Sequence, residues 1–248
     1  MPNIARVTLL IMLLHTALGA IIPYLPVWLA EAKGLTGTQT GLLLASSSFG
    51  RILFGPLAAA WAEGRLDRRT PVIAFGVMAA LGYWTLGILA PFWPIALGCF
   101  ATGVAVQCLV AFSESTTLRA TANSVVWPYG RARALASTAF AAASLGAGAC
   151  VQAFGVGAAY IWFVAALSVF CAASFALSPD PVETKPDRPM AARLWGGIGL
   201  FANKAFLLSV IAAGLIQAAH AFYYGFSSTL WLAQGFSGTQ VGLLWALG

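Results

Sequence analysis

Long apolar runs separated by short polar stretches set the pattern of this chain. A helix that crosses a bilayer needs about 20 mostly apolar residues. Seven such runs lie near residues 7–30, 39–62, 71–90, 94–113, 134–155, 158–177 and 205–231, and an eighth begins near residue 239. The pattern predicts an all-α membrane protein whose helices zigzag across a lipid bilayer.

Composition supports the same class of protein. Hydrophobic residues make up 60% of the chain and charged residues 8%, whereas a soluble domain carries about 25% charged residues. The net charge of +6 lies in loops between apolar runs, without the aromatic-interleaved basic patch typical of nucleic-acid binding. Lipid is therefore the expected surrounding partner, and nucleic acid is excluded.

No motif for enzymatic chemistry stands out. The Walker loop of ATP-driven proteins and the dinucleotide glycine motif are absent from the sequence, and no nucleophile is aligned with a base. The four cysteines lie in apolar runs without a C-x-x-C pair, and the two histidines have no histidine partner at i+4. We therefore expect neither an enzyme nor a bound cofactor or metal.

The positions of Lys and Arg predict the orientation. Eleven of the 13 basic residues lie on one side of the zigzag, Lys33 lies alone on the other side, and Arg51 lies inside a run. Because cytoplasmic loops carry the excess of basic residues, the N-terminus is expected in the cytoplasm. The chain should then be a multi-pass integral protein of the cytoplasmic (inner) membrane.

The longest charged stretch divides the chain. Residues 179–204 contain four prolines and charges of both signs, a composition that breaks helices and favours a solvated linker. We predict six spans in residues 1–178, a cytoplasmic linker over residues 179–204, and the start of a second transmembrane half in residues 205–248.

A repeated segment supports this division. W-L-A occurs at Trp28 and again at Trp231, and G-T-Q-x-G-L-L occurs at Gly37 and again at Gly238. Self-similarity at an offset of 201 to 203 residues indicates two related parallel halves. Doubling the offset predicts a complete chain of roughly 400 residues. The sequence is therefore expected to be a fragment that stops within its eighth helix.

Six spans, a cytoplasmic loop and the start of a second set resemble the layout of the major facilitator superfamily. Three stretches are similar to its 3-phenylpropionic acid permease branch: H-A-F-Y-Y-G-F-S from His220, Y-G-R-A-R from Tyr129, and Arg51 ten residues after Gly41. The superfamily signature between the second and third helices is degenerate, since Ala59 stands where it has an aspartate. The resemblance implies a secondary active transporter that moves a small organic solute, such as an aromatic carboxylate, by alternating access and together with a proton.

Arg51 is the leading candidate for contact with the solute. It lies about 12 residues from each end of its run, which places it roughly 18 Å from either surface. A central arginine costs about 2.5–3.5 kcal/mol even on the lenient insertion scale, so it should face a cavity or a partner. It is either a counter-charge for an anionic solute or a structural partner of a buried acid or of helix carbonyls. Gln107 and Gln152 are interpreted as packing or hydrogen-bonding residues.

A polar stripe on the seventh run supplies further candidates. Gln217, His220 and Tyr224 follow the spacing i, i+3, i+7 and share one helical face, and Tyr223 lies beside them. These residues are candidates for binding the solute by hydrogen bonds, for proton relay at the histidine, or for aromatic stacking. The alternatives are hydrogen bonds that join the two halves and ordinary aromatic packing.

Glu114, Arg131, Arg133 and His15 are the candidates for coupling or gating. Glu114 lies near the inner surface, where a salt bridge to Arg131 or Arg133 is the first interpretation and a proton-carrying role the second. His15 lies near mid-depth in the first run, where a satisfied structural histidine is the first interpretation. No other acid lies within a run, so the residues give little other support for proton coupling in this half.

Two rival functions remain open at this stage. A sugar or nucleoside symporter would share the layout and would keep its affinity for a neutral solute after substitution of Arg51. A truncated, non-transporting membrane protein is the alternative from a different class, and substitution of Arg51 or His220 would then alter no solute flux. The expected partners are the solute, a proton and the bilayer, and the sequence does not define the oligomeric state.

Overall fold

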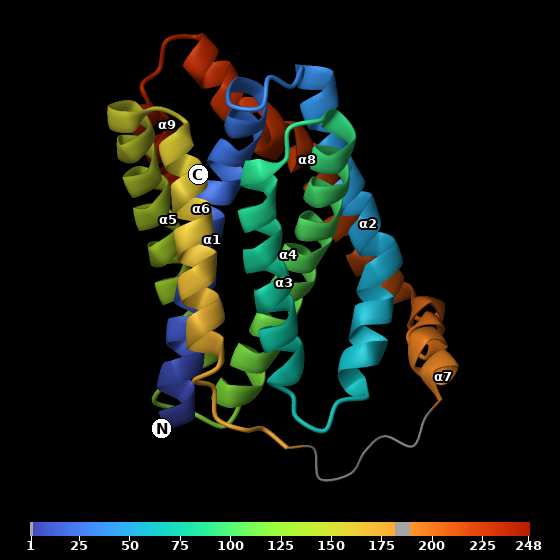
Figure 1. The fold of residues 1–248 in the computed structure, drawn as a ribbon. Coiled ribbons are helices and arrows are strands. Elements are labelled where there is room, and N and C mark those ends of the chain that lie inside the picture. The colour runs from blue at the N-terminus through green and yellow to red at the C-terminus, as the bar shows by residue number, and fades with distance from the viewer. Residues whose placement is uncertain (1, 182–188) are drawn as a thin grey trace.

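Each predicted apolar run forms a helix in the computed structural model, which describes residues 2–181 and 189–248. Seven of the helices in these residues are long and apolar enough to cross a membrane, and the all-α fold class is confirmed (Figure 1). The helices are α1 (Pro2–Glu31), α2 (Gly37–Glu63), α3 (Thr70–Ile88), α4 (Phe92–Thr121), α5 (Tyr129–Phe154), α6 (Gly157–Ser174), α7 (Met190–Trp195), α8 (Lys204–Ala233) and α9 (Gly238–Leu247), with a 3₁₀ turn, η1 (Ile198–Ala202), between α7 and α8.

α4 extends beyond the apolar run that predicted it. The run ends near residue 113, but the helix continues for two more turns to Thr121. Hydroxyls of this polar segment donate to carbonyls one turn back, from Thr117 Oγ1 to Ser113 O and from Thr121 Oγ1 to Thr117 O, both at 2.8 Å. Loss of hydropathy marks where the apolar surface stops, whereas the backbone hydrogen bonds decide where a helix ends. Glu114 therefore lies within a helix.

Part of the predicted linker is helical. α7 and η1 both lie within residues 179–204, and α7 packs beside α2. The basic residues Lys185 and Arg188 lie outside the described residues.

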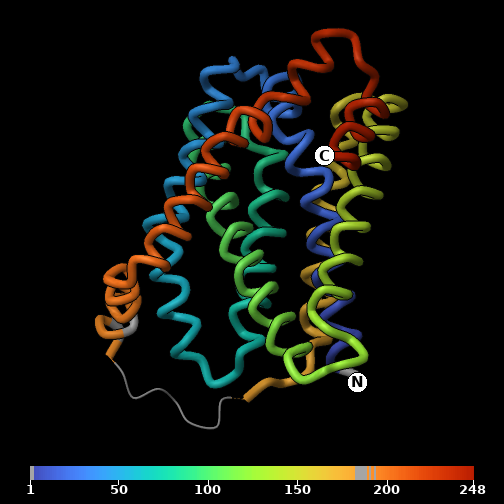
Figure 2. The backbone as a smooth tube through the Cα atoms, turned by 180° about the vertical axis from the view of Figure 1, so that it is seen from behind, coloured from blue at the N-terminus to red at the C-terminus, as the bar shows by residue number. Residues whose placement is uncertain are grey.

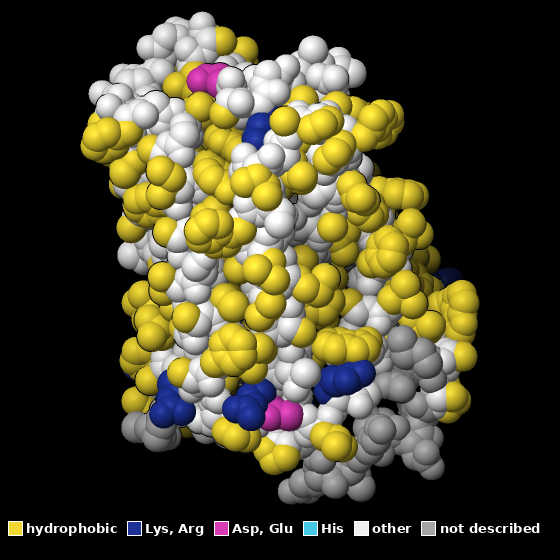
Figure 3. Space-filling view, viewed as in Figure 1, with side chains coloured by type: hydrophobic (Ala, Val, Ile, Leu, Met, Phe, Trp, Pro, Cys, Tyr) yellow, Lys and Arg dark blue, Asp and Glu magenta, His cyan; other side chains and the backbone are white. Residues whose placement is uncertain are grey.

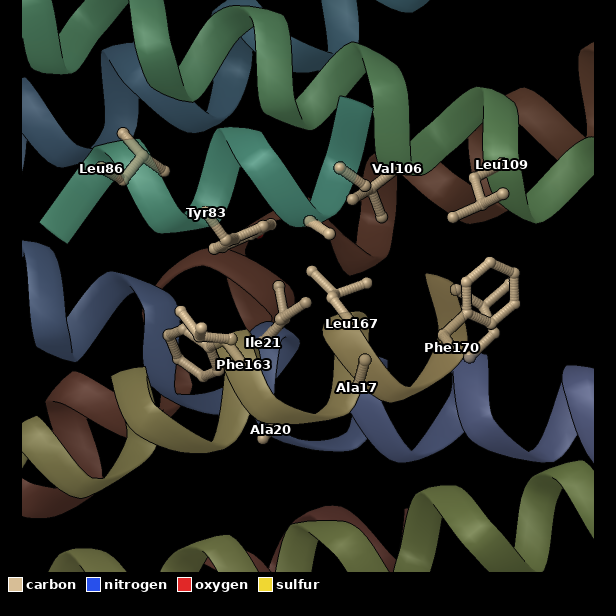
Figure 4. Packing of buried hydrophobic residues seen from close by; sticks show 14 of the residues in the cluster. Ala17, Ala20, Ile21, Tyr83, Leu86, Val106, Leu109, Phe163, Leu167 and Phe170 are labelled. Carbon is tan, nitrogen blue, oxygen red and sulfur yellow. The ribbon is translucent and has the colours of Figure 1, made fainter. Parts of the chain in front are cut away.

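α1 lies at the centre of the bundle. It packs against α4, α5, α6 and α8, and its small residues Ala17 and Ala20 are fully buried. Large buried side chains of neighbouring helices fill the core beside α1, including Phe163 of α6, whose ring lies 5.9 Å from that of Tyr83 on α3 (Figure 4). This core joins α1, α3, α4 and α6, and it leaves the opposite face of α4 for other contacts.

The helices end at two levels, named here the Lys33 end and the linker end. α1 ends and α2 begins at the Lys33 end, where α8 also ends after crossing the bundle diagonally (Figure 2). Lys33 donates from Nζ to Gly87 O at 2.8 Å and to Leu89 O at 2.7 Å. These carbonyls belong to the C-terminus of α3, where a cation is favoured by the helix dipole. Lys33 is therefore a cap of α3.

Charged side chains gather mainly at the linker end. In Figure 3 most of the Lys and Arg side chains form a band at the lower end, and hydrophobic side chains cover the flank above it. The helices long enough to span a bilayer carry many exposed apolar residues, among them Trp84, Ile161 and Leu81. The surface is that of a multi-pass integral membrane protein, because lipid is the solvent in which exposed apolar side chains cost nothing.

The repeated segment is a helix–corner–helix unit with a physical reason for its shared residues. Gly34 and Gly235 follow α1 and α8 with positive φ angles of 68° and 91°, a conformation that glycine adopts without strain. Capping boxes then open α2, between Thr36 and Gln39, and α9, between Ser237 and Gln240. The common G-T-Q letters therefore specify the start of a helix at the same end of the bundle in each copy.

The loop between α2 and α3 holds the segment that follows α6. Arg68 donates its backbone N–H to Asp180 O at 3.0 Å, and Asp180 donates its N–H to Asp67 Oδ1 at 3.2 Å. Arg69 binds Asp67 at 2.6 Å and reaches Leu177 O at 3.3 Å. Burial alone would raise the pKa of the Asp67 carboxyl, but these N–H groups and the Arg69 guanidinium outweigh burial and hold that pKa below its usual value.

Candidate functional site

Four polar residues lie at one depth in the bundle. His15, Arg51, Gln107 and His220 are each 13 to 16 residues from the Lys33 end of their own helices, α1, α2, α4 and α8. At 1.5 Å per residue this corresponds to roughly 20–24 Å along each helix. Because all four helices cross the apolar zone, these residues form a polar layer near its middle.

Close packing of α2 on α4 sets the position of Arg51. A Cβ atom at Gly50 would lie 2.6 Å from both Phe100 Cε2 and Val104 Cγ2, and one at Gly103 would lie 2.5 Å from Ser47 Cβ. The absence of side chains at these two positions allows the helices to approach each other closely. The residue after Gly50 is then held beside the polar face of α4.

Arg51 has a neutral partner. Its Nη1 donates to Gln107 Oε1 at 3.3 Å, and the arginine side chain is otherwise exposed. Among residues 2–181 and 189–248, no carboxylate lies within 4.0 Å of this guanidinium. Of the two roles open from the sequence, the pairing with a buried acid therefore finds no support in the described part of the chain. The arginine carries a positive charge that only an amide oxygen partly balances.

His15 belongs to a second group. It is buried, and its Nδ1 lies 2.8 Å from Ile11 O, a carbonyl that can only accept a hydrogen bond. Its Nε2 lies 2.5 Å from Arg133 Nη1, which can only donate. The two contacts are satisfied together by one species, a neutral imidazole with its proton on Nδ1 and its lone pair on Nε2. The tautomer is thus assigned from its partners.

Glu114 balances the charge of Arg133. Its Oε1 lies 3.7 Å from Arg133 Nε, and its Oε2 accepts a hydrogen bond from the Tyr129 hydroxyl at 2.5 Å. Of the two salt bridges considered from the sequence, the structure contains the one to Arg133, whereas Arg131 donates to the carbonyl of Val126. The chain His15–Arg133–Glu114–Tyr129 therefore joins α1, α4 and α5.

One face of α4 connects the two groups. Gln107 and Glu114 are seven residues apart, which is two turns, so both side chains leave the same face of the helix. Their partners, Arg51 and Arg133, consequently lie along that face about 10 Å apart in depth. No hydrogen bond between the two arginine groups occurs among the described residues. The Arg51 and Arg133 groups both contact this face of α4, but in the described part of the chain they do not contact each other.

An aromatic cluster forms where α8 meets α9. The His220 ring stacks on Tyr224 at a centroid distance of 5.6 Å, and Tyr224 stacks in turn on Trp245 at 5.8 Å. Tyr223 approaches the same indole at 4.7 Å. Sequence reasoning missed Trp245 because a tryptophan within an apolar run carries no signal of its own. Its Nε1 donates to Ser228 Oγ at 2.8 Å, which fixes the orientation of its ring.

The register between α2 and α8 places Gln217 at the level of Arg51. The two helices run antiparallel and meet near the Lys33 end, where a Cβ on Gly41 would lie 3.0 Å from Phe226 Cζ. Arg51 lies ten residues beyond Gly41 toward the linker end, and Gln217 lies nine residues before Phe226 in the same direction. Gln217 is exposed, and no hydrogen bond joins it to Arg51 in the described residues.

A metal is not expected at these positions. The described residues contain no group of three or more His, Cys, Asp and Glu side chains that could hold a metal ion. The donors and acceptors at the polar layer are suited to hydrogen bonding and to charge pairing with a small molecule instead.

The bundle is that of a multi-pass integral membrane protein. The chain belongs to the MFS_1 like family, which matches residues 4–248. It is 31% identical over 241 residues to the protein named "Probable 3-phenylpropionic acid transporter" of Escherichia coli (strain K12), with 93% of this chain and 60% of that protein covered. A 43-residue stretch is 42% identical to the lactose permease of Klebsiella pneumoniae and covers 17% of this chain and 33% of that permease.

Solved structures agree on the fold. A crystal structure of a mutant of the nucleoside transporter NupG matches with a TM-score of 0.79 at 14% identity, over 98% of this chain and 64% of that one. The crystal structure of NupG itself matches with a TM-score of 0.74 at 14% identity, over 93% and 58%. The chain thus spans about 60% of the length of the Escherichia coli relative and of the NupG structures. These relatives are transporters and not enzymes.

Proposed function

We propose that the whole protein is a secondary active transporter of a small organic anion, with an aromatic carboxylate as the favoured solute class. The observation that carries the proposal is the Arg51 guanidinium, which lies at mid-depth and, among the described residues, has the Gln107 amide as its one hydrogen-bond partner. A carboxylate is the group that a guanidinium binds best, through two parallel N–H···O bonds. The name of the Escherichia coli relative points to the same kind of solute.

The aromatic part of such a solute would meet α8. Tyr224 and His220 offer exposed ring faces at the level of the polar layer, and Trp245 supports Tyr224 from behind. Flat rings stack on such faces with a gain of about 0.5–1.5 kcal/mol beyond burial. Gln217, at the depth of Arg51, adds a hydrogen-bonding amide. The solute would then contact residues from both parts of the chain, Arg51 before the linker and α8 after it.

Proton coupling is assigned to the His15 group. Arg133 donates to His15 Nε2, which is possible only while that nitrogen is unprotonated. A proton on Nε2 removes the acceptor and sets two cations side by side, so Arg133 must turn away toward Glu114 or toward the solute. Glu114 and Tyr129 keep the displaced guanidinium balanced. Protonation is thereby linked to the position of Arg133, whose partner Glu114 lies on the same face of α4 as Gln107, the partner of Arg51.

Alternating access would use the contact between α5 and α9. These helices touch backbone to backbone at the Lys33 end, through Gly148, Gly238 and Gly242, whereas the first half of α8 is exposed at the linker end. Residues 1–178 and 205–248 are proposed to belong to two halves that rock about the polar layer, joined by the linker over 179–204. The basic linker end would face the cytoplasm, in the inner membrane.

Uptake by the full-length protein tests the anion site. Arg51→Gln should lower kcat/KM for 3-phenylpropionate by about 10- to 150-fold, because a charge-assisted hydrogen bond contributes about 1.5–3 kcal/mol. Arg51→Lys should lose less. Arg65→Gln, which removes an exposed arginine at the linker end, is the matched control and should transport normally. Equal uptake by the Arg51→Gln and Arg65→Gln variants would refute the assignment.

A second substitution tests the charge argument without removing the arginine. Gln107→Glu places a carboxylate where an amide oxygen already lies 3.3 Å from Arg51 Nη1. The internal carboxylate should satisfy the guanidinium, compete with an anionic solute and weaken its binding. Unchanged binding of 3-phenylpropionate in this variant would mean that the solute does not use Arg51.

A neutral, ring-bearing solute such as a nucleoside is the second candidate, favoured by the likeness to NupG in fold. Such a solute would use the aromatic cluster and Gln217 without the guanidinium. Uptake of uridine that survives Arg51→Gln, together with no uptake of 3-phenylpropionate by the wild type, would select this candidate. Flux of neither solute above that of empty vesicles would favour the non-transporting alternative.

A further inference from the structure

A second polar site lies at the linker end, apart from the polar layer. It is a pocket of about 220 Å³ between the start of α1, the α2–α3 loop, the last turns of α4 and the segment after α6. At about 30 Å³ per water molecule, this volume suits a small hydrated anion. The charged and hydroxyl side chains that line it are Arg68, Arg69, Arg119, Thr116, Ser178 and Asp180.

The walls of the pocket are fixed by hydrogen bonds. The Asp67–Arg69 pair and the backbone bonds between Arg68 and Asp180 hold the segment after α6 against the α2–α3 loop. Arg6 of α1 ties the same segment from the other side, by donating to Ala176 O at 3.1 Å and to Ser178 Oγ at 3.2 Å. Three of the four segments around the pocket are therefore tied together by hydrogen bonds.

Positive charge is in excess around this pocket. Arg69 is paired with Asp67 at 2.6 Å, and Arg68 lies 3.8 Å from Asp180, which is a loose pair. Arg119 donates only to the hydroxyls of Ser115, at 2.9 Å, and Thr116, at 3.4 Å. Among the residues described, no carboxylate lies within 4.0 Å of the Arg119 guanidinium.

From this arrangement we infer that the pocket binds a phosphate group. A phosphate can accept from Arg119 and from Arg68 at the same time, and guanidinium groups match its oxygens in pairs. Thr116 and Ser178 supply neutral hydroxyl donors. Arg119 lies two residues before the end of α4 and Asn3 lies at the start of α1, so the pocket opens at the level where a bilayer has its headgroups. A lipid headgroup and free phosphate are the two sources of this chemistry.

Native mass spectrometry of the full-length protein in a neutral detergent tests the inference. The probes are phosphatidylglycerol, inorganic phosphate and a galactosyl diacylglycerol, which has acyl chains but no phosphate. Arg119→Gln should weaken phosphatidylglycerol binding by about tenfold, whereas Arg131→Gln, an exposed arginine at the same end outside the pocket, should change it by less than about twofold. Thr116→Val should produce a smaller loss in the same direction.

The three probes separate the sources. Binding of phosphatidylglycerol that millimolar phosphate does not displace identifies a headgroup site. Displacement by phosphate, with stabilisation of the wild type but not of Arg119→Gln by phosphate alone, identifies a site for the free ion. Equal loss in the Arg119→Gln and Arg131→Gln variants, or equal binding of the galactolipid, overturns the inference, since either result reduces the effect to general attraction at the membrane surface. Elution of each variant at the wild-type position on size exclusion confirms that it is folded.

Discussion

Gly148→Val tests how the Lys33 end is held closed. Gly148 on α5 faces Gly238 on α9, and a Cβ atom at Gly148 would press on the Gly238 carbonyl and lie 2.6 Å from Tyr24 Oη. The Tyr24 hydroxyl is buried and donates to that same carbonyl at 3.0 Å. A side chain at position 148 must therefore push α9 or Tyr24 away.

The size of the effect follows from two terms. Overpacking costs about 1–3 kcal/mol, and loss of the Tyr24–Gly238 hydrogen bond costs about 0.5–1.5 kcal/mol. Together they weaken the closed contact by roughly 1.5–4.5 kcal/mol, which shifts a two-state equilibrium by about 12- to 1,600-fold. Little compensation is available, since Gly242 on the next turn of α9 is as close to the Ser144 carbonyl.

Cross-linking measures the contact directly. Thr239 N donates to Gln152 Oε1 at 3.2 Å across the same interface, so cysteines at these two positions report whether α5 and α9 are together. In a background without the four native cysteines, Gly148→Val should reduce the yield with a short bifunctional reagent in membranes. Ala149→Val, one residue on and exposed, is the matched control. Full yield in both variants, or an equal loss in both, would refute the reasoning.

Three further predictions concern single side chains. At pH values above 3.8, the ordinary pKa of an aspartate carboxyl, Asp67→Asn should lower the melting temperature. The difference from wild type should shrink as the pH falls through the lower pKa of Asp67 in the folded state, because protonation releases Arg69. A pH-independent difference would contradict this. Glu114→Gln should impair solute accumulation driven by a pH gradient while exchange without a gradient persists, and equal loss of both would argue against coupling through this group. Lys33→Met should cost about 0.5–1.5 kcal/mol in unfolding experiments, since the α3 carbonyls lose their donor, and an unchanged unfolding midpoint would show that Lys33 does not act as a cap.

Hydropathy located the spans because lipid demands apolar helices, but it could not say which helices touch. On a soluble helix the polar face marks solvent, so the buried face can be read from the sequence. Here both faces are apolar: on α6, Phe163 is fully buried while Ile161, two residues earlier, is 67% exposed. The packing of α1 against α4, α5 and α6 could therefore not be predicted from the hydropathy pattern.

Part of the candidate site could be predicted from the sequence, because a membrane-spanning helix is otherwise apolar. A polar side chain within an apolar run or at its edge is conspicuous, so Arg51 and His15 within their runs, and Glu114 and Arg133 at the edges of theirs, could be singled out individually. The pairing of His15 with Arg133 joins positions 118 residues apart, and a single sequence contains no information on such a distance. The roles assigned to these residues and to His220 remain predictions.

The two arginines that pair with one face of α4, Arg51 and Arg133, differ in how their charge is balanced, and the proposed division between binding and coupling rests on this difference. Arg133 is balanced by Glu114, so a proton on His15 would add one positive charge to this group and would require Arg133 to change its hydrogen-bond partner. Arg51 has no carboxylate among the described residues, and a central arginine costs about 2.5–3.5 kcal/mol in a membrane. In the proposed transporter, an anionic solute would supply the counter-charge that the described residues do not give Arg51. Because Glu114 lies two turns of α4 from Gln107, protonation of His15 would then act about 10 Å in depth from the proposed anion site.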